Sequence, residues 1–233
     1  MADNISKLAG FFTGRPRKGS NAVAVIGLGR FGTALALELM ELGVEVLGID
    51  RNSDIIDELD GKLTHLVAGD STDETLLREL GVDECERAVV AIGTDIEASI
   101  LTTSRLVKFQ IPSIWAKATS EPHGEILTQL GVTNVISPES DMGRRVAHLI
   151  RGRIHDYVPI DADFSIVRMA APQNVIGVPL DELRLRRTRG VTIIAEKVDG
   201  NWRVTQRDTV LDGRNEILVA GTPAQLADFG GNG

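Results

Sequence analysis

The sequence predicts an α/β fold, with a Rossmann-like, doubly wound parallel sheet followed by a small C-terminal α+β domain. Three observations predict it: short apolar runs alternate with helical patterns, a glycine-rich turn follows the first run, and the pattern changes after Asp156. Repeated alternation of strand and helix is typical of a parallel sheet that has helices on both faces.

Six short apolar runs are expected to form the first sheet. Small and branched side chains fill each run, as in strands that are buried on both faces. The runs are AVAVIG (22–27), EVLGID (45–50), HLVAGD (65–70), RAVVAIG (87–93), SIWAKA (113–118) and NVIS (134–137). Before three of the strands, at Gly43, Gly81 and Gly131, a glycine follows a leucine that closes a helix. This is the left-handed cap position, which glycine fills without strain.

The domain boundaries follow from these patterns. Residues 1–20 are expected to be a flexible tail, residues 21–139 the doubly wound domain, residues 140–155 a connecting helix, and residues 156–233 the second domain. The second domain is too short to be the substrate domain of a conventional dehydrogenase.

Ser137 and Pro138 predict where the connecting helix begins, as its cap and its first helical residue. One face of this helix is apolar, with Met142, Val146, Leu149, Ile150 and Ile154. In the second domain, strands are expected at FSIVRMAA (164–171), TIIAEKVDG (192–200), NWRVT (201–205) and EILVAG (216–221), and helices at LDELRLRR (180–187) and PAQLADF (223–229).

Composition excludes several classes of protein. The chain has 233 residues, 42% of them hydrophobic and 25% charged, as in an ordinary soluble globular protein. A net charge of −8 argues against a nucleic-acid partner. No apolar run approaches the roughly 20 residues of a membrane span, and no signal peptide is expected. The single cysteine, Cys85, excludes an intrachain disulfide, and the histidines and cysteine do not have the spacing of a zinc site. We therefore expect a cytoplasmic chain.

Three glycines mark a dinucleotide-binding turn in the stretch VIGLGRFG. Gly27, Gly29 and Gly32 follow a strand and open a helix. The first glycine permits the tight turn, the second lets a pyrophosphate approach the backbone, and the third allows close packing of helix on strand. The second strand ends at Asp50, which is placed to accept hydrogen bonds from ribose hydroxyls. Its neighbour Arg51 leaves open whether a 2′-phosphorylated cofactor is excluded.

Arg30 is the unusual residue of this turn. It lies in the first turn of the helix, where the macrodipole disfavours a cation. A bound anion would reverse this preference, because the backbone N–H groups and the guanidinium would both contact it. Arg30 is therefore expected to reach a phosphate beyond the two that the turn holds, and its neighbour Phe31 is included in the site. The alternative is an arginine that extends into solvent.

Further binding residues are expected at the carboxyl ends of the later strands, where open sheets bind ligands. They are Asp70, Ser71, Ile92, Gly93 and Lys117. The alternative for Asp70 and Ser71 is capping of the next helix, and the alternative for Lys117 is an exposed lysine at a strand end.

Several segments of the sequence together resemble the RCK-domain regulatory subunits of Ktr/Trk-type potassium uptake systems, most closely the KtrA type. They are IGLGRFG, VLGIDRN, VAGDSTDETLLRELGV, VVAIGTDIEASILTT, IWAKA and SPESDMGRRVA, followed by a small second domain. The resemblance runs from about Asn21 to the C-terminus.

The resemblance implies a regulatory protein that is not an enzyme. Its relatives assemble from dimers into homo-octameric rings on the cytoplasmic face of a membrane-embedded, potassium-translocating subunit of the KtrB/TrkH type. ATP activates them, ADP inactivates them, and some members bind NAD or NADH. By resemblance, Arg30 contacts the outer phosphate of ATP, Asp50 holds ribose, and Lys117 lies near the nucleotide. Glu139 helps to hold a divalent cation, Mg²⁺ or Ca²⁺, although an acidic residue also favours a helix's first turn without any ligand.

The second domain of the family can bind cyclic di-AMP at a dimer interface. Here the phrase LRLRRTRG supplies Arg184, Arg186, Arg187 and Arg189, with Arg186 at the matching position. Arginines ahead of a glycine cap also suit a helix C-terminus without a ligand, so both interpretations stay open.

Two other classes of function compete with a nucleotide-sensing regulatory module. The first is an NAD(H)-binding redox sensor or oxidoreductase, which the fold alone does not exclude. Against it stand the missing substrate domain and the lack of an acid–base constellation. The second is a transcription factor, which the acidic composition and the lack of a helix-turn-helix pattern disfavour. A cytosolic regulatory subunit that senses ATP and ADP is the reading that the sequence favours.

Overall fold

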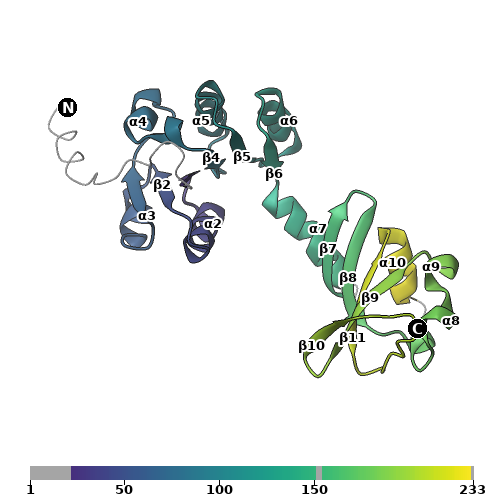
Figure 1. The fold of residues 1–233 in the computed structure, drawn as a ribbon. Helices are drawn as coiled ribbons and strands as arrows, with labels where there is room; N and C mark the ends of the chain where they lie inside the picture. Colours follow the sequence, from purple (N-terminus) through teal and green to yellow (C-terminus); the bar gives the residue numbers. More distant parts are fainter. Residues whose placement is uncertain (1–21, 151–153, 232–233) are drawn as a thin grey trace. The chain divides into compact units, whose positions relative to one another are not determined.

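The chain forms two compact units, Met1–Glu139 and Ser140–Gly233, here called the N-terminal and C-terminal units. Residues 22–150 and 154–231 are described in this computed structural model (Figure 1). The expected tail, residues 1–20, lies outside the described residues.

The N-terminal unit is built on a six-stranded parallel sheet with the order β3-β2-β1-β4-β5-β6. All six strands that the sequence predicts are present, and the doubly wound fold is confirmed. They are β1 (Val23–Ile26), β2 (Val46–Asp50), β3 (His65–Ala68), β4 (Arg87–Val90), β5 (Ser113–Lys117) and β6 (Asn134–Ile136). The strand order reverses between β1 and β4. In open parallel sheets, ligands bind at this point, at the carboxyl ends of the strands.

Helices cover both faces of this sheet (Figure 1). One face is covered by α2 (Arg30–Glu41) and α3 (Ser53–Glu58), and the other by α4 (Glu74–Glu79), α5 (Ile96–Lys108) and α6 (Glu121–Gln129). A short 3-10 helix, η1 (Val82–Glu84), follows α4. Fully buried leucines on α4, α5 and α6, namely Leu77, Leu106 and Leu127, belong to the larger core cluster of this unit. The three predicted glycine caps have φ angles of +76°, +73° and +94° at Gly43, Gly81 and Gly131, as expected for left-handed caps.

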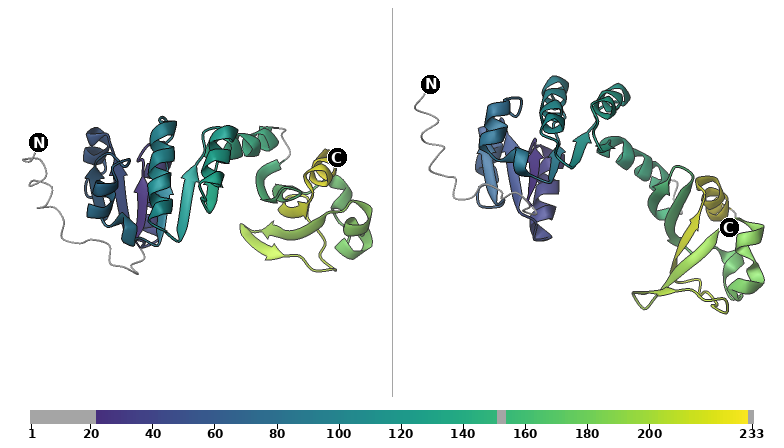
Figure 2. Two further views of the ribbon diagram at one scale, coloured as in Figure 1. Left: turned by 90° about the horizontal axis from the view of Figure 1, so that it is seen from above. Right: turned by 45° about the horizontal axis from the view of Figure 1, so that its top comes forward.

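The C-terminal unit is built on a five-stranded antiparallel sheet, with the order β10-β9-β11-β8-β7. Its strands are β7 (Ile154–Asp161), β8 (Phe164–Ala170), β9 (Thr192–Val198), β10 (Asn201–Val204) and β11 (Glu216–Gly221). The helical elements are α7 (Pro138–Ile150), η2 (Gln173–Val175), α8 (Leu180–Leu183), α9 (Leu185–Thr188) and α10 (Pro223–Gly231). Leu226 and Phe229 of α10 are buried in the core of this unit, and Figure 2 shows this helix against the sheet from two further directions. The predicted α+β domain is confirmed.

The connecting helix differs from its prediction. It begins at Pro138, as the Ser-Pro pair predicts, but it spans Pro138–Ile150 rather than residues 140–155. Ile154, which the apolar pattern placed on the helix, and His155, which lay within the predicted bounds, belong to strand β7. The sequence analysis did not predict this strand. Side chains join α7 to this strand, because Arg145 pairs with Asp156 at 2.7 Å and the ring of His148 stacks on Tyr157.

The phrase LDELRLRR was expected to form one helix and instead forms two short ones. Arg184 separates α8 from α9 with a φ angle of +49°, in the left-handed region. The arginines that follow have partners inside the unit: Arg186 donates a hydrogen bond to Thr192 Oγ1 at 3.3 Å, and Arg189 pairs with Asp228 at 3.1 Å.

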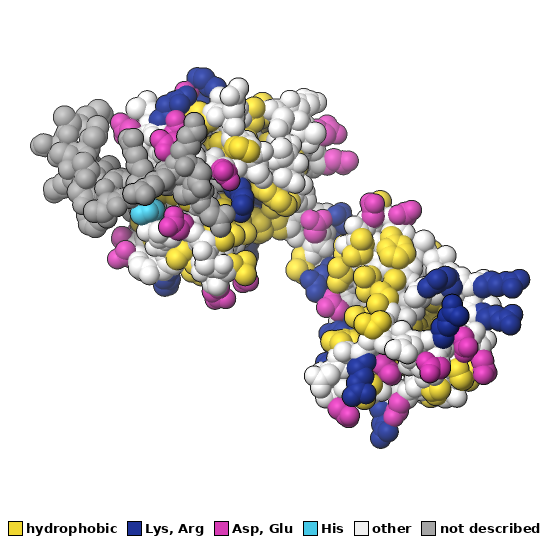
Figure 3. Space-filling model, viewed as in Figure 1, with side chains coloured by type: hydrophobic (Ala, Val, Ile, Leu, Met, Phe, Trp, Pro, Cys, Tyr) yellow, Lys and Arg dark blue, Asp and Glu magenta, His cyan; other side chains and the backbone are white. Residues whose placement is uncertain are grey.

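Exposed apolar side chains gather on the hairpin of β7 and β8. Val158, Ile160 and Phe164 are 46%, 58% and 43% exposed. Figure 3 shows hydrophobic side chains clustered over this part of the C-terminal unit. Near the opposite end of the same two strands, Glu216 contacts His155 at 2.7 Å and Arg168 at 3.2 Å.

Candidate functional site

The glycine-rich turn between β1 and α2 is shaped by close backbone contacts. Gly27 has a φ angle of +91°, and a Cβ there would lie 2.9 Å from the backbone nitrogen of Ile92. A Cβ at Gly32 would overlap the carbonyl oxygen of Gly27. Helix α2 can therefore approach the sheet only with glycine at these two positions.

Gly29 differs from the other two glycines. It is the N-cap of α2, with an ordinary φ angle of −67°, so the backbone does not require glycine there. A Cβ at Gly29 would meet no atom of the described residues within 4 Å. The open space above this residue, at a helix N-terminus, fits the expected approach of a phosphate group.

Asp50 lies where the turn and the end of β2 meet. Its Oδ2 accepts a hydrogen bond from the backbone N–H of Leu28 at 2.6 Å, and its Oδ1 accepts one from Asn52 N–H at 2.8 Å. The carboxylate is half-buried. It therefore also holds the glycine turn against β2, a structural role that the sequence did not indicate.

Arg30 begins α2 and is exposed. Within the described residues its guanidinium makes no hydrogen bond or ion pair. The positive end of the helix and an unpaired guanidinium lie together, a combination that favours an anion. Phe31, the next residue, is half-buried, and its ring centroid lies 6.0 Å from Lys117 Nζ.

Lys117 and Glu139 form an ion pair at the end of β5. Lys117 Nζ donates to Glu139 Oε1 at 2.6 Å across 22 residues of sequence. Lys117 is only 8% exposed, so the alternative of an exposed lysine at a strand end is wrong. The hydrogen bond from Lys117, and more weakly the charge of Arg30, hold the pKa of Glu139 below its usual value. Arg30, Lys117 and Glu139 are thus close enough to interact electrostatically.

Gly93 leaves room for Lys117 on the other side. A Cβ at Gly93 would lie 3.2 Å from Lys117 Nζ and 3.9 Å from Thr119 Cγ2. Ile92, beside it, packs under the glycine turn through its backbone, against Gly27. The ends of β1, β4 and β5 therefore meet at one place.

Asp70 and Ser71 do not cap the next helix, so that alternative is wrong. The N-cap of α4 is Asp73, whose side chain accepts from the N–H groups of Thr75 and Leu76. Asp70 instead accepts hydrogen bonds from the backbone and hydroxyl of Thr72, at 2.9 and 2.8 Å. Ser71 is buried and its hydroxyl lies 2.8 Å from that of Thr102 on α5.

Arg51 is turned toward another partner. Its guanidinium pairs with Asp95 at 3.0 Å, and Asp95 is the N-cap of α5. Both side chains lie near the surface. The structure therefore gives Arg51 a structural partner that is separate from the group of Arg30, Lys117 and Glu139.

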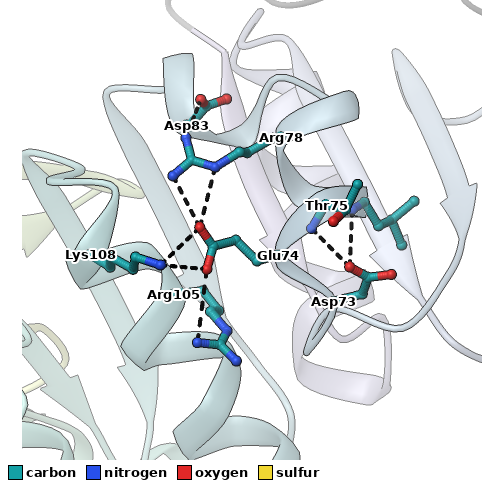
Figure 4. Close-up of polar contacts among 8 residues, drawn as sticks. Asp73, Glu74, Thr75, Arg78, Asp83, Arg105 and Lys108 are labelled. Carbon is teal, nitrogen blue, oxygen red and sulfur yellow. Dashed lines mark hydrogen bonds and ion pairs between the residues drawn. The ribbon is translucent and has the colours of Figure 1, made fainter.

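A charge network behind the loop of Asp70 and Ser71 was missed by the sequence reading. Glu74, in the first turn of α4, accepts from Arg78 at 3.1 Å and from Lys108 of α5 at 2.8 Å, with Arg105 at 3.9 Å (Figure 4). These contacts lower the pKa of Glu74, with the hydrogen bond from Lys108 as the largest cause. The spacing of Glu74 and Arg78 is a helical i,i+4 pair that the sequence could have revealed. The contact with Lys108, 34 residues away, has no local signal.

The described residues do not contain a cluster of metal-binding side chains. In residues 22–150 and 154–231, no three His, Cys, Asp or Glu side chains gather as they would around a metal ion. Glu139, the ligand that the resemblance implies, is therefore not part of such a group in the described residues. No helix in the same ranges is long and apolar enough to cross a membrane.

Residues 23–138 match the model of the TrkA-N domain. Ktr system potassium uptake protein C of Bacillus subtilis (strain 168) is 36% identical over 208 residues, which cover 88% of this chain and 94% of that protein. The chain belongs to the Ktr potassium uptake protein family. Ktr system potassium uptake protein A of the same organism is 37% identical over 179 residues, covering 76% of this Ktr-family chain and 81% of the relative.

Solved structures share the fold of this Ktr-family protein. The crystal structure of the GsuK RCK domain matches with a TM-score of 0.63 and 19% identity, covering 97% of this chain and 51% of that one. The GsuK channel bound to NAD matches with a TM-score of 0.66 and 20% identity, covering 98% and 42%. The chain thus spans about half the length of these GsuK chains, and at such identities the likeness shows the fold alone.

Proposed function

We propose that this Ktr-family chain is a regulatory subunit that senses nucleotides and controls potassium flux through a membrane-embedded, potassium-translocating partner of the KtrB/TrkH type. It acts by binding rather than by catalysis. It works on the cytoplasmic side of the membrane as a homo-oligomer, with dimers that assemble into an octameric ring. The membership of the Ktr family supports the link to potassium uptake.

The position of Arg30 favours ATP over the other nucleotides. Its guanidinium is exposed and lacks a partner among the described residues, and it begins the helix whose N-cap, Gly29, has open space above it. The backbone N–H groups of this turn would hold an inner pair of phosphates, and Arg30 would reach one further phosphate. ATP offers that phosphate, whereas ADP and NAD do not. Bound ATP and ADP would differ at this position by the outermost phosphate and its negative charge, and a sensor of their exchange requires such a difference in contacts.

The Lys117–Glu139 pair gives a route by which a nucleotide would change the chain. Lys117 Nζ is held by Glu139, the second residue of α7. A phosphate near Lys117 would compete with the Glu139 carboxylate for the same ammonium. Glu139 would then be free to contact a divalent cation, Mg²⁺ or Ca²⁺, that accompanies the nucleotide. Either change acts on the first turn of α7.

An NAD(H) sensor is the second candidate. Asp50 at the end of β2 suits the ribose of any of these nucleotides. A channel with this fold has been solved with NAD bound. In that case Arg30 would have no phosphate to contact.

The test is calorimetry on the full-length chain with ATP, ADP, NAD and NADH, with and without Mg²⁺ or Ca²⁺. Arg30→Ala is compared with Arg87→Ala, since Arg87 is exposed at the amino end of β4, on the opposite edge of the sheet. We expect Arg30→Ala to weaken ATP by about tenfold, near 1.4 kcal/mol, and ADP much less. Arg87→Ala should leave both unchanged. Tighter binding of NADH than of ATP, with no effect of Arg30→Ala, contradicts the proposal and favours the redox sensor.

A further inference from the structure

The loop between β5 and α6 connects the candidate site to the rest of the domain. It follows Lys117 directly, and its residue Thr119 lies beside Lys117, since both would contact a Cβ at Gly93. Thr119 is exposed, whereas Ala118 before it is buried. The position of Thr119 therefore decides part of the surface that a ligand at Gly93 and Lys117 would meet.

His123 holds this loop from behind. Its Nδ1 accepts a hydrogen bond from the backbone N–H of Thr119 at 3.3 Å and lies 3.2 Å from the Thr119 hydroxyl. In return, the backbone N–H of His123 donates to Oγ of Ser120, the N-cap of α6, at 3.3 Å. The arrangement resembles a capping box with histidine at the third helical position, except that its side chain accepts from the N–H of Thr119, the residue before the N-cap Ser120, rather than from Ser120 itself.

The contacts of His123 define its protonation state. Nδ1 accepts from an N–H group, so in the neutral ring the proton lies on Nε2. The residue is 1% exposed, and Nε2 is buried without a hydrogen-bond partner in the described part of the chain. Burial lowers the pKa of His123. A charged ring would have a proton on Nδ1 and would leave the Thr119 N–H without an acceptor.

We propose that His123, as the neutral Nε2–H tautomer, is a positioning residue for nucleotide binding. It fixes the loop of Thr119 and thereby the surface beside Lys117. A loop that is already ordered loses less conformational entropy when a ligand binds, so the hydrogen bonds of His123 increase affinity without touching the ligand. This role rests on the proposed function, because it needs a nucleotide at the carboxyl edge of the sheet.

The test compares three variants of the full-length chain. His123→Phe keeps an aromatic ring but removes the acceptor, and His123→Gln restores an acceptor of the usual capping-box kind. Leu127→Val is the matched control, since Leu127 is also fully buried on α6 but lies in the core cluster, away from the loop. ATP and ADP affinities are measured by calorimetry, and unfolding midpoints are measured on the same samples.

We expect His123→Phe to weaken ATP binding by about fivefold to tenfold, equivalent to about 1 kcal/mol, while His123→Gln returns to within about twofold of wild type. Leu127→Val should lower the unfolding midpoint and leave affinity unchanged. Equal affinity for wild type and His123→Phe overturns the inference and leaves the proposed function standing. A wild-type chain that binds none of the nucleotides overturns the proposed function itself.

A second measurement does not depend on any variant. In ¹H–¹⁵N spectra of the imidazole groups, His123 should show a protonated Nε2 and an unprotonated Nδ1 at neutral pH. A ring protonated on Nδ1 would lack the acceptor for Thr119, and that result also overturns the inference.

Discussion

On the β1 side of the candidate site, backbone contacts fix the turn, whereas on the β5 side one ion pair joins two side chains 22 residues apart. The glycine turn has no space for side chains at Gly27 and Gly32, since both residues are packed against backbone atoms. The Lys117–Glu139 pair is held by one hydrogen bond to a carboxylate whose side chain is 66% exposed. In the proposed function, the first side would hold the constant part of a nucleotide, and the second side would respond to it.

The rigid side should be the more costly one to alter. In Gly32→Ala, the new Cβ would overlap the Gly27 carbonyl, and the helix must move away from the sheet. We expect a loss of about 3 kcal/mol in the free energy of unfolding, measured by urea denaturation.

Gly29→Ala is the matched control for that variant. It adds the same methyl group in open space, with a φ angle that alanine accepts. Stability should change by no more than about 0.5 kcal/mol, while nucleotide affinity falls, because the methyl group occupies the approach to the helix N-terminus. If Gly29→Ala destabilises the chain as much as Gly32→Ala does, then Gly29 is also required for packing, and the distinction drawn between the two glycines is wrong.

The contrast between the two sides also explains what the sequence could reveal. The six strands of the first sheet, the glycine turn and the caps at Gly43, Gly81 and Gly131 are local patterns, and each was predicted. The bond between Lys117 and Glu139, and the network of Glu74 with Lys108, depend on distances between separate elements, so no spacing in the sequence indicates them.

Two predictions were wrong, one at the end of the connecting helix and one in the second domain. The helical period of Met142, Val146 and Ile150 continues to Ile154, yet the chain pairs there with β8 as strand β7. At Arg184 the backbone adopts a positive φ angle, which a run of good helix formers gives no reason to expect. At Ile154, pairing with β8 overrides the helical pattern, and at Arg184 the local pattern does not predict the break between the two helices.

The responsive side should show an asymmetry between its two partners. Glu139→Ala leaves the buried Lys117 ammonium without its partner, which should cost about 1–3 kcal/mol of unfolding free energy. Lys117→Met removes the buried charge and keeps the volume, so it should cost less, because the remaining carboxylate is largely in solvent. Urea denaturation of both variants measures the difference. A larger loss for Lys117→Met would mean that the ammonium, rather than its pairing, stabilises this edge.

The loop behind Lys117 adds a dependence on pH. Burial holds the pKa of His123 below the value of about 6.5 that is usual for histidine, so below that pH the unfolded chain binds a proton that the folded chain does not. Stability should therefore fall as the pH decreases below about 6.5, with a slope of at most about 1.4 kcal/mol per pH unit from this residue. His123→Phe should remove the contribution of this residue to the pH dependence, which corresponds to at most about one proton. The free energy of unfolding of both chains is measured by urea denaturation between about pH 5 and pH 8. An identical slope in both chains would assign it to other groups.

The smallest effect on stability is expected for Arg51→Ala. This variant can therefore test whether Arg51 takes part in binding without disturbing the fold. Its pair with Asp95 lies at the surface, and such pairs add little to stability because water and salt screen them. Asp95 also accepts from the backbone N–H of Ala98, and this contact, more than Arg51, lowers the pKa of Asp95. Arg51→Ala should therefore leave the unfolding midpoint unchanged in a thermal scan, since the cap of α5 stays in place.

The same variant tests whether the site accepts a 2′-phosphorylated cofactor. If Arg51 contacts a 2′-phosphate, the affinity for NADP falls while the affinity for NAD stays the same. Unchanged affinities for ATP, NAD and NADP would restrict recognition at the end of β2 to Asp50.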